Sequence, residues 1–183
     1  MKRILFTVCF VVLSIVSYAQ GCVTTFLGIP IDGTKAEMIQ KLSNKGFQYD
    51  RQLDCLIGEF NGEKVQIFIH TNGNKVKRLA ILDEYGKDIM NIRIRFNNLY
   101  RQFEDNKRYT SGSVTFEIPE KEDISYEMLV HNKRYEAIFY QKGDNGFDIN
   151  RLVWFMIHKG SYGDYRIVMF YENRLNEANG EDL

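Results

Sequence analysis

Three runs of alternating apolar and polar residues, joined by Asn-Gly pairs, constrain the fold of this chain more than any other feature. The runs cover residues 53–60, 64–70 and 75–82, and the pairs are Asn61-Gly62 and Asn72-Gly73. Asn-Gly favours two-residue hairpin turns, because both residues accept the positive φ angles that such turns need. The middle run alternates in a way that buries one face and leaves the other mostly polar. An antiparallel meander is therefore predicted.

A helix is predicted immediately before the meander, over residues 34–45, after a short strand at 24–27. Thr34 and Glu37 have the spacing of a capping box, in which each side chain satisfies a free backbone N–H at the start of a helix. Gly46 followed by Phe47 has the form of a glycine C-cap with its hydrophobic contact.

A second helix is predicted over residues 89–103. Its apolar residues recur at steps of three or four, the helical period: Ile89, Ile92, Phe96, Leu99, Tyr100 and Phe103. The segment 92–96 alone would also fit a strand, but the stripe continues for too long for an ordinary strand.

The second helix is followed by further strand-like runs, at residues 114–118, 126–130, 134–141, 151–158 and 165–171. A helix followed by a meander thus occurs twice, although the two stretches share no residue-level identity. We expect an α+β, two-layer fold of two tandem halves with a sheet each, followed by a polar tail. The halves are residues 20–86 and 87–172, and the tail is residues 173–183.

The last two strands are apolar on both faces. Phe155 and its in-phase neighbours lie on one face of residues 151–158, whereas Leu152, Trp154 and Met156 lie on the other. Either the second face packs against the other half of the protein, or it is an exposed aromatic platform for a partner. Two substantial helices cannot cover both faces of two sheets. We therefore expect one side of the strands that carry Tyr135, Trp154 and Tyr165 to be incompletely covered by the helices, which makes these residues a candidate binding face.

The N-terminus has the form of a cleavable signal peptide over residues 1–19. A cationic start precedes the mostly apolar run 4–16, and Ser17-Tyr18-Ala19 fits the small-x-small cleavage rule, with the cut before Gln20. The run is shorter than the roughly 20 residues of a membrane span, so no transmembrane anchor is expected in the mature chain. The protein is expected in the periplasm or outside the cell. The alternative is a lipoprotein anchored through Cys22.

Cleavage would remove Cys9 and leave Cys22 and Cys55 in a compartment that permits disulfides. A bond between them would close a loop of about 34 residues and stabilise the fold by roughly 3–4 kcal/mol. Two separate buried thiols are the alternative.

Charge and motifs exclude several functions. Losing Lys2 and Arg3 lowers the count of Lys and Arg from 24 to 22 against 24 Asp and Glu, a formal charge of −2. Nucleic acid is therefore not an expected partner. His70, His131 and His158 belong to no metal or catalytic motif, and no cofactor or metal is expected. The sequence displays no activating group beside Cys55, so a hydrolase is the least favoured function.

Three segments carry a resemblance to known proteins: residues 26–50, which begin Phe-Leu-Gly-Ile-Pro-Ile-Asp-Gly-Thr; residues 95–103; and the ending Asn-Gly-Glu-Asp-Leu at 179–183. They resemble a family of small exported proteins of Gram-negative bacteria that has no settled function. The doubled helix-plus-meander order is similar to the β-lactamase-inhibitor-protein architecture, and the start of its first helix is similar to that of small outer-membrane assembly lipoproteins. The resemblance implies protein binding through a sheet face but transfers no contact residues.

The sequence therefore predicts an exported, non-catalytic binding protein whose ligand is a protein partner. A glycan-binding module of the cell envelope is the alternative, because the same aromatic side chains also stack on sugar rings.

Overall fold

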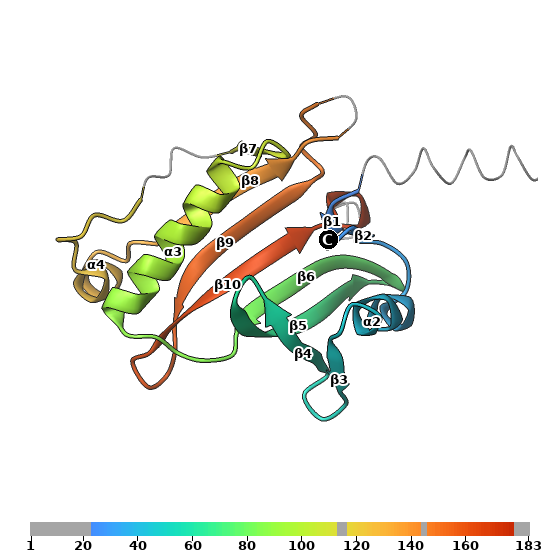
Figure 1. Ribbon diagram of the computed structural model, residues 1–183, viewed down its shortest axis with the longest axis horizontal. Helices are drawn as coiled ribbons and strands as arrows, with labels where there is room; N and C mark the ends of the chain where they lie inside the picture. Colours follow the sequence, from blue (N-terminus) through green and yellow to red (C-terminus); the bar gives the residue numbers. More distant parts are fainter. Residues whose placement is uncertain (1–22, 113–116, 144–145, 178–183) are drawn as a thin grey trace, which may run out of the picture.

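The computed structural model describes residues 23–112, 117–143 and 146–177. The predicted signal peptide and Cys22 lie outside these residues. The helices are α2 (Lys35–Ser43), α3 (Ile89–Glu104), α4 (Ile124–Val130) and the 3-10 turn η1 (Arg174–Asn176). The strands are β1 (Thr25–Phe26), β2 (Ile29–Pro30), β3 (Gln48–Asp50), β4 (Cys55–Phe60), β5 (Glu63–Asn72), β6 (Lys75–Asp83), β7 (Tyr109–Ser111), β8 (Glu136–Gln141), β9 (Leu152–Lys159) and β10 (Tyr165–Glu172). Figure 1 shows their arrangement.

The predicted meander is confirmed, because β4, β5 and β6 pair antiparallel in sequence order. At the first turn Asn61 and Gly62 have φ angles of 52° and 74°, as a hairpin with two left-handed residues requires. The predicted strand at 24–27 is shorter: β1 pairs with β2 in a small hairpin whose turn contains Leu27 and Gly28.

Both main helices begin where a side chain caps them. In α2 the Glu37 N–H donates to Thr34 Oγ1 (3.3 Å), and the Thr34 N–H donates to Glu37 Oε2 (2.8 Å), which completes the predicted capping box. In α3 the Asn91 N–H donates to Asp88 Oδ1 (2.8 Å). Each cap satisfies a backbone donor that the helix itself cannot pair.

Residues 126–130, predicted as a strand, belong instead to α4. The cap explains the difference, because the Tyr126 N–H donates to Asp123 Oδ1 (3.0 Å) and starts a helix there. Only Ile124 of this helix is buried. The predicted run at 114–118 falls largely outside the described residues.

The main strands form one sheet, where the sequence predicts two. The strand order is β3-β4-β5-β6-β10-β9-β8-β7, so two four-stranded meanders meet where β6 pairs antiparallel with β10. A separate helix precedes each meander in the chain, α2 before β3 and α3 before β7. The α+β class is therefore correct.

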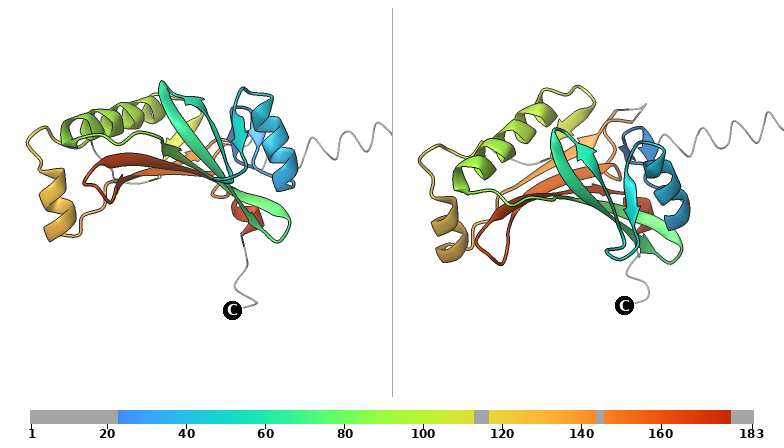
Figure 2. Two further views of the ribbon diagram at one scale, coloured as in Figure 1. Left: turned by 90° about the horizontal axis from the view of Figure 1, so that it is seen from below. Right: turned by 60° about the horizontal axis from the view of Figure 1, so that its bottom comes forward.

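Both main helices pack on the same face of this sheet, as the two views of Figure 2 show. Helix α3 lies over β9 and β10, and α2 lies against the first meander. One continuous core fills the space beneath them, and its largest side chains include Phe26, Phe96, Phe139 and Phe155. Neither α2 nor α3 covers the other face. Among the described residues, no helix has the length and apolar character needed to cross a membrane.

Candidate functional site

The face of the sheet away from α2 and α3, here called the open face, carries a row of apolar residues across five strands. Successive pairs in the strand register link them in this order: Phe68, Ala80, Phe170, Trp154 and Ile138. Four of these side chains are half-buried, and the small Ala80 is buried between Phe68 and Phe170. A parallel row adds Leu82, Val168 and Met156, also half-buried. The open face is thus broad and predominantly apolar.

Trp154 and Phe170 form the centre of the open face. Their rings stack with centroids 4.2 Å apart and planes inclined by 19°. On β6, which pairs with the other edge of β10, the guanidinium carbon of Arg78 lies 5.2 Å from the centroid of the Phe170 ring. This distance is within the range of a cation–π contact.

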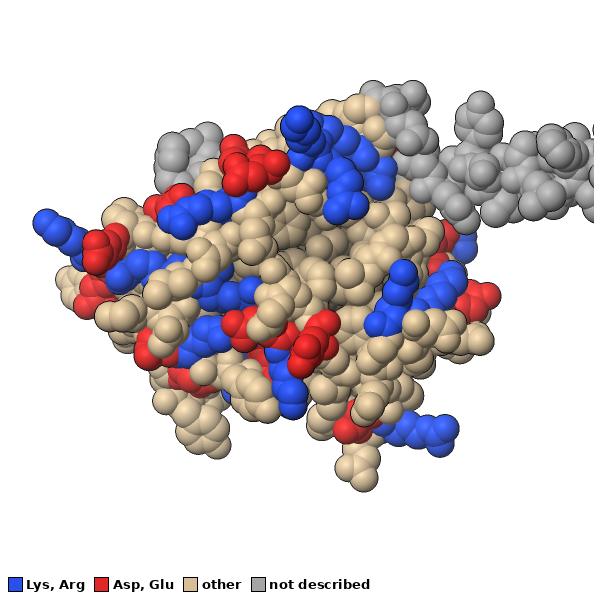
Figure 3. Space-filling view, in the orientation of Figure 1, with Lys and Arg blue, Asp and Glu red and all other residues tan. Residues whose placement is uncertain are grey.

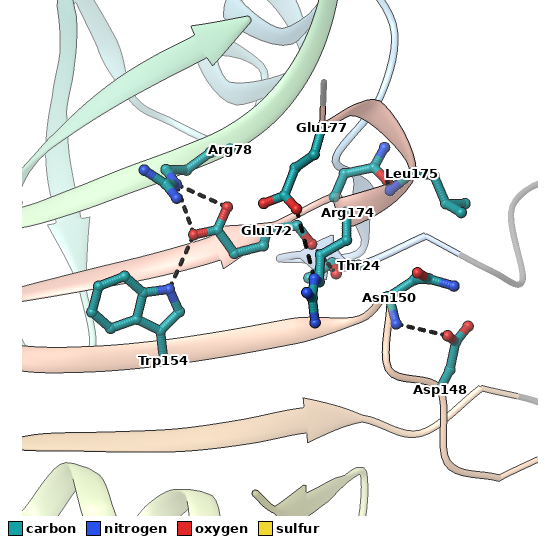
Figure 4. Close-up of polar contacts among 10 residues, drawn as sticks. Thr24, Arg78, Asp148, Asn150, Trp154, Glu172, Arg174, Leu175 and Glu177 are labelled. Carbon is teal, nitrogen blue, oxygen red and sulfur yellow. Dashed lines mark hydrogen bonds and ion pairs between the residues drawn. The ribbon is translucent and has the colours of Figure 1, made fainter. Parts of the chain in front are cut away.

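Glu172 links Arg78 to Trp154 and lies between them, as Figure 4 shows. Its carboxylate accepts hydrogen bonds from Arg78 Nε (2.7 and 2.8 Å) and from Trp154 Nε1 (3.0 Å). The Glu172 side chain is only 2% exposed, so the carboxylate serves these partners and not solvent. Its backbone carbonyl accepts from the Thr24 hydroxyl, which ties β10 to the start of the described chain. The indole is therefore held in place by a hydrogen bond within the protein.

Three arginines at the open face are paired with carboxylates of the same chain. Besides Arg78 with Glu172, Arg166 pairs with Asp164 at 3.0 Å and Arg134 with Glu136 at 3.5 Å. Burial and the neighbouring Arg78 lower the pKa of His70 below its usual value, which favours the neutral imidazole at neutral pH. The open face therefore offers apolar contact without a marked excess of either charge.

Of the three aromatic residues predicted to share a binding face, only Trp154 lies on the open face. Tyr165 and Tyr135 are 3% and 5% exposed and belong to the core beneath the helices. Tyr165 is in phase with the buried Ile167 and Met169, and the strand pleat therefore directs it away from Trp154. The grouping of the three residues is corrected accordingly.

Phe170, which the sequence analysis did not include in the binding face, is the actual neighbour of Trp154. The signal was present in the alternation of β10, because Val168 and Phe170 oppose the tyrosines of the same strand. The register that pairs Phe170 with Trp154 could not be read without knowing the length of the β9–β10 turn.

Cys55 begins β4 and is fully buried, with no disulfide to any described residue. Burial, aided by Asp50 and Asp54, raises the pKa of its thiol. A raised pKa lowers the fraction of reactive thiolate, the opposite of what a nucleophile needs. The predicted Cys22–Cys55 disulfide stays a prediction, since Cys22 lies outside the described residues.

The three histidines lie on different elements of the fold. His131 interacts with Glu127, four residues earlier, at 2.9 Å, and His70 and His158 lie on β5 and β9. Within residues 23–112, 117–143 and 146–177, no three His, Cys, Asp or Glu side chains form a group that could hold a metal ion.

No protein-family model, no curated protein and no solved structure matches this chain. The resemblance to exported Gram-negative proteins therefore stays a prediction.

Proposed function

We propose that this protein is an exported binding protein that holds a protein partner on its open face, centred on Trp154 and Phe170. The observation that carries the proposal is a stacked Trp–Phe pair, fixed by a buried carboxylate, on a sheet face that α2 and α3 leave uncovered. Tryptophan in a pre-ordered setting is typical of interface hot spots, because little side-chain entropy is lost on binding.

The chemistry of the open face favours an apolar, uncharged patch on the partner protein. The arginines of the open face already have carboxylate partners within the chain, so a charged ligand would have to compete with them. Leu82, Met156 and Val168 surround the central rings and extend the apolar area. A broad apolar face suits protein–protein contact, whereas a sugar needs a narrower site with polar groups beside a ring.

We also propose that the chain is organised as two tandem units. Two units, residues 20–86 with α2 before β3–β6 and residues 87–172 with α3 before β7–β10, would meet edge to edge at β6 and β10. The symmetric strand order supports this description. So does the resemblance to β-lactamase-inhibitor-protein architecture, which implies partner binding through a sheet face. Export to the periplasm or the cell exterior rests on the sequence of residues 1–19.

The proposal is tested by capture from a cell-envelope extract with matched variants. Wild-type protein and Tyr162→Ala, which changes a 98% exposed tyrosine away from the central rings, should retain the same partner protein. Phe170→Ala should lose that partner while still unfolding in a cooperative thermal transition. Equal retention by all three proteins would contradict a binding site at the centre of the open face.

A further inference from the structure

A cleft of about 560 Å³ lies on the helix side of the sheet, where β1, the end of α3 and β7 meet. Figure 3 shows the surface hollowed beside α3, with Lys and Arg side chains gathered at one rim. Its volume falls within the range of about 300–1,000 Å³ that small-ligand sites occupy. The cleft is separated from the open face by the thickness of the sheet.

Three polar side chains make part of the cleft wall: Gln141, Tyr109 and Tyr171. The Gln141 amide is fully engaged, since its Nε2 donates to the Thr25 carbonyl (2.7 Å) and to the Tyr109 hydroxyl (3.0 Å), and its Oε1 accepts from the Thr25 N–H (2.8 Å). Gln141 thus holds the Tyr109 hydroxyl in place but leaves that hydroxyl's own proton unassigned.

The hydroxyls of Tyr109 and Tyr171 together have one more hydrogen-bond donor than their mutual contact uses. Tyr171 is 4% exposed, and its hydroxyl interacts with that of Tyr109. One contact between two hydroxyls uses only one of their two protons. Among the described residues, no other acceptor takes the second proton, so one O–H of this pair is left to act as a donor beside the cleft.

The rim of the cleft also has more donors than acceptors. Lys45 and Arg108 line it and form no ion pair with any residue of the described chain. The side-chain oxygens of Gln102 and Asn106, which also line the cleft, already accept hydrogen bonds from the Asn61 amide and the Arg108 N–H. The NH₂ groups are therefore the part of these two amides that is left to act as further donors. Glu59 is the one carboxylate among the residues that line it.

Aromatic rings supply the apolar part of the cleft. Phe60 packs edge-on against Phe26 with centroids 4.9 Å apart, and Tyr109 packs edge-on against Phe103 at 4.8 Å. Phe60 and Tyr109 are only half-buried, so part of each ring is accessible. Flat, fixed rings beside hydrogen-bonding groups are typical of sites that hold a sugar ring.

We propose that this cleft binds a short acidic glycan, one whose sugar rings carry carboxylates. The carboxylate would accept hydrogen bonds from Arg108 and Lys45, a ring oxygen or hydroxyl would accept the leftover phenol proton, and the apolar face of a sugar would stack on Phe60. Glu59 would accept from a sugar hydroxyl. This site is independent of the open face, and either proposal can fail without the other.

The test is titration calorimetry of the purified protein with a trisaccharide of galacturonic acid, using the neutral galactose trisaccharide as the matched probe. The acidic sugar should bind saturably, and the neutral sugar about tenfold or more weakly, because charge-assisted hydrogen bonds are lost. Arg108→Gln should weaken binding of the acidic sugar by about tenfold. Tyr109→Phe, which keeps the ring, should weaken it several-fold.

Arg174→Gln is the control, since Arg174 pairs with Glu177 and does not line the cleft. It should leave the affinity unchanged, and thermal melts should show that all variants fold. Absence of saturable binding by the acidic sugar would overturn the proposal. The proposal would also be overturned if the neutral sugar bound as tightly as the acidic one, or if Arg174→Gln weakened binding as much as Arg108→Gln. Benzoate, titrated in the same way, is a carboxylate that carries no sugar ring. If benzoate binds and the acidic sugar does not, the cleft is a carboxylate site and the glycan proposal is wrong.

Discussion

Trp154 on β9 lies directly opposite Phe170 on β10, and the two rings stack 4.2 Å apart on the open face of the sheet. Trp154 is also the single tryptophan of the chain, so its fluorescence reports on this face alone. The pair and the buried Glu172 that bonds to Trp154 give the open face a defined centre, and this centre can be tested before any partner is known.

Replacing Glu172 with alanine should destabilise the protein and loosen Trp154. The change leaves Trp154 Nε1 and Arg78 Nε without their acceptor, a loss of roughly 1–3 kcal/mol in the free energy of unfolding. Chemical denaturation measures the loss, and acrylamide quenching of the tryptophan should become more efficient. Glu177→Ala is the control, because Glu177 pairs only with Arg174 among the described residues. Identical quenching in wild type and Glu172→Ala would show that the carboxylate does not hold the indole.

The core position of Tyr165 and the open-face position of Phe170 predict different losses of stability when each residue is replaced by alanine. Tyr165→Ala should lower the free energy of unfolding by about 3–5 kcal/mol, because it empties a large core site beneath the helices. Phe170→Ala should lower it clearly less, since that ring is only half-buried. Urea denaturation of wild type and both variants measures these free energies of unfolding. Equal losses would mean that the open face is packed as a core in solution.

The capping box of α2 should contribute measurably to stability. Thr34→Ala removes the acceptor for the Glu37 N–H and should cost about 1 kcal/mol. Thr71→Ala, at an exposed position of β5, serves as the comparison and should change stability little. A loss in Thr34→Ala no larger than in Thr71→Ala would show that the box is not formed in solution.

Stability should fall at alkaline pH through Tyr171. Full burial, assisted by the neighbouring Tyr109, raises the pKa of Tyr171 well above its usual value. In the unfolded chain this phenol ionises near pH ~10, so above that pH the unfolded state binds fewer protons than the folded state. The free energy of unfolding therefore decreases as pH rises.

Denaturation curves recorded from neutral pH to beyond pH ~10 measure this decrease. Tyr171→Phe should show a weaker dependence on pH, whereas Tyr162→Phe, which changes an exposed tyrosine, should behave like wild type. The same slope in all three proteins would rule out Tyr171 as the source.

The exported form should begin at Gln20 and carry no lipid. Intact mass of the protein purified from its native cell envelope tests this start, and a mass increase matching a diacylated Cys22 would support the lipoprotein alternative. The same sample, unfolded without reductant, should show no reactive thiol if Cys22 and Cys55 are joined. Labelling of two thiols would end the disulfide prediction.

Local signals in the sequence predicted local structure well. Asn61-Gly62 and the Thr34–Glu37 pair each specify a geometry through neighbouring residues alone, and both are confirmed. The segment 126–130 is helical and not the predicted strand, because the Asp123 side chain caps its first turn and Glu127, Met128 and Leu129 favour a helix. A helix cap acts through one hydrogen bond, and such a bond is easily overlooked beside a run of apolar residues.

Long-range features could not be predicted from residues alone. The pairing of β6 with β10 depends on which strand edges remain free after each meander forms, and it turns two expected sheets into one. The failed alternation in β9 indicated correctly that this sheet has a second apolar face. It did not indicate which residues share that face, because the register between strands decides that.

The central claim, that the open face holds a protein partner, is tested most directly by photo-crosslinking. A photoreactive amino acid placed at Met156, beside Trp154 on the open face, should crosslink one defined protein in the native cell envelope, and Phe170→Ala in the same chain should abolish the product. The same amino acid at Ile94, exposed on the outer side of α3, should give no such product. Crosslinking of the same partner from Ile94 but not from Met156 would contradict the account.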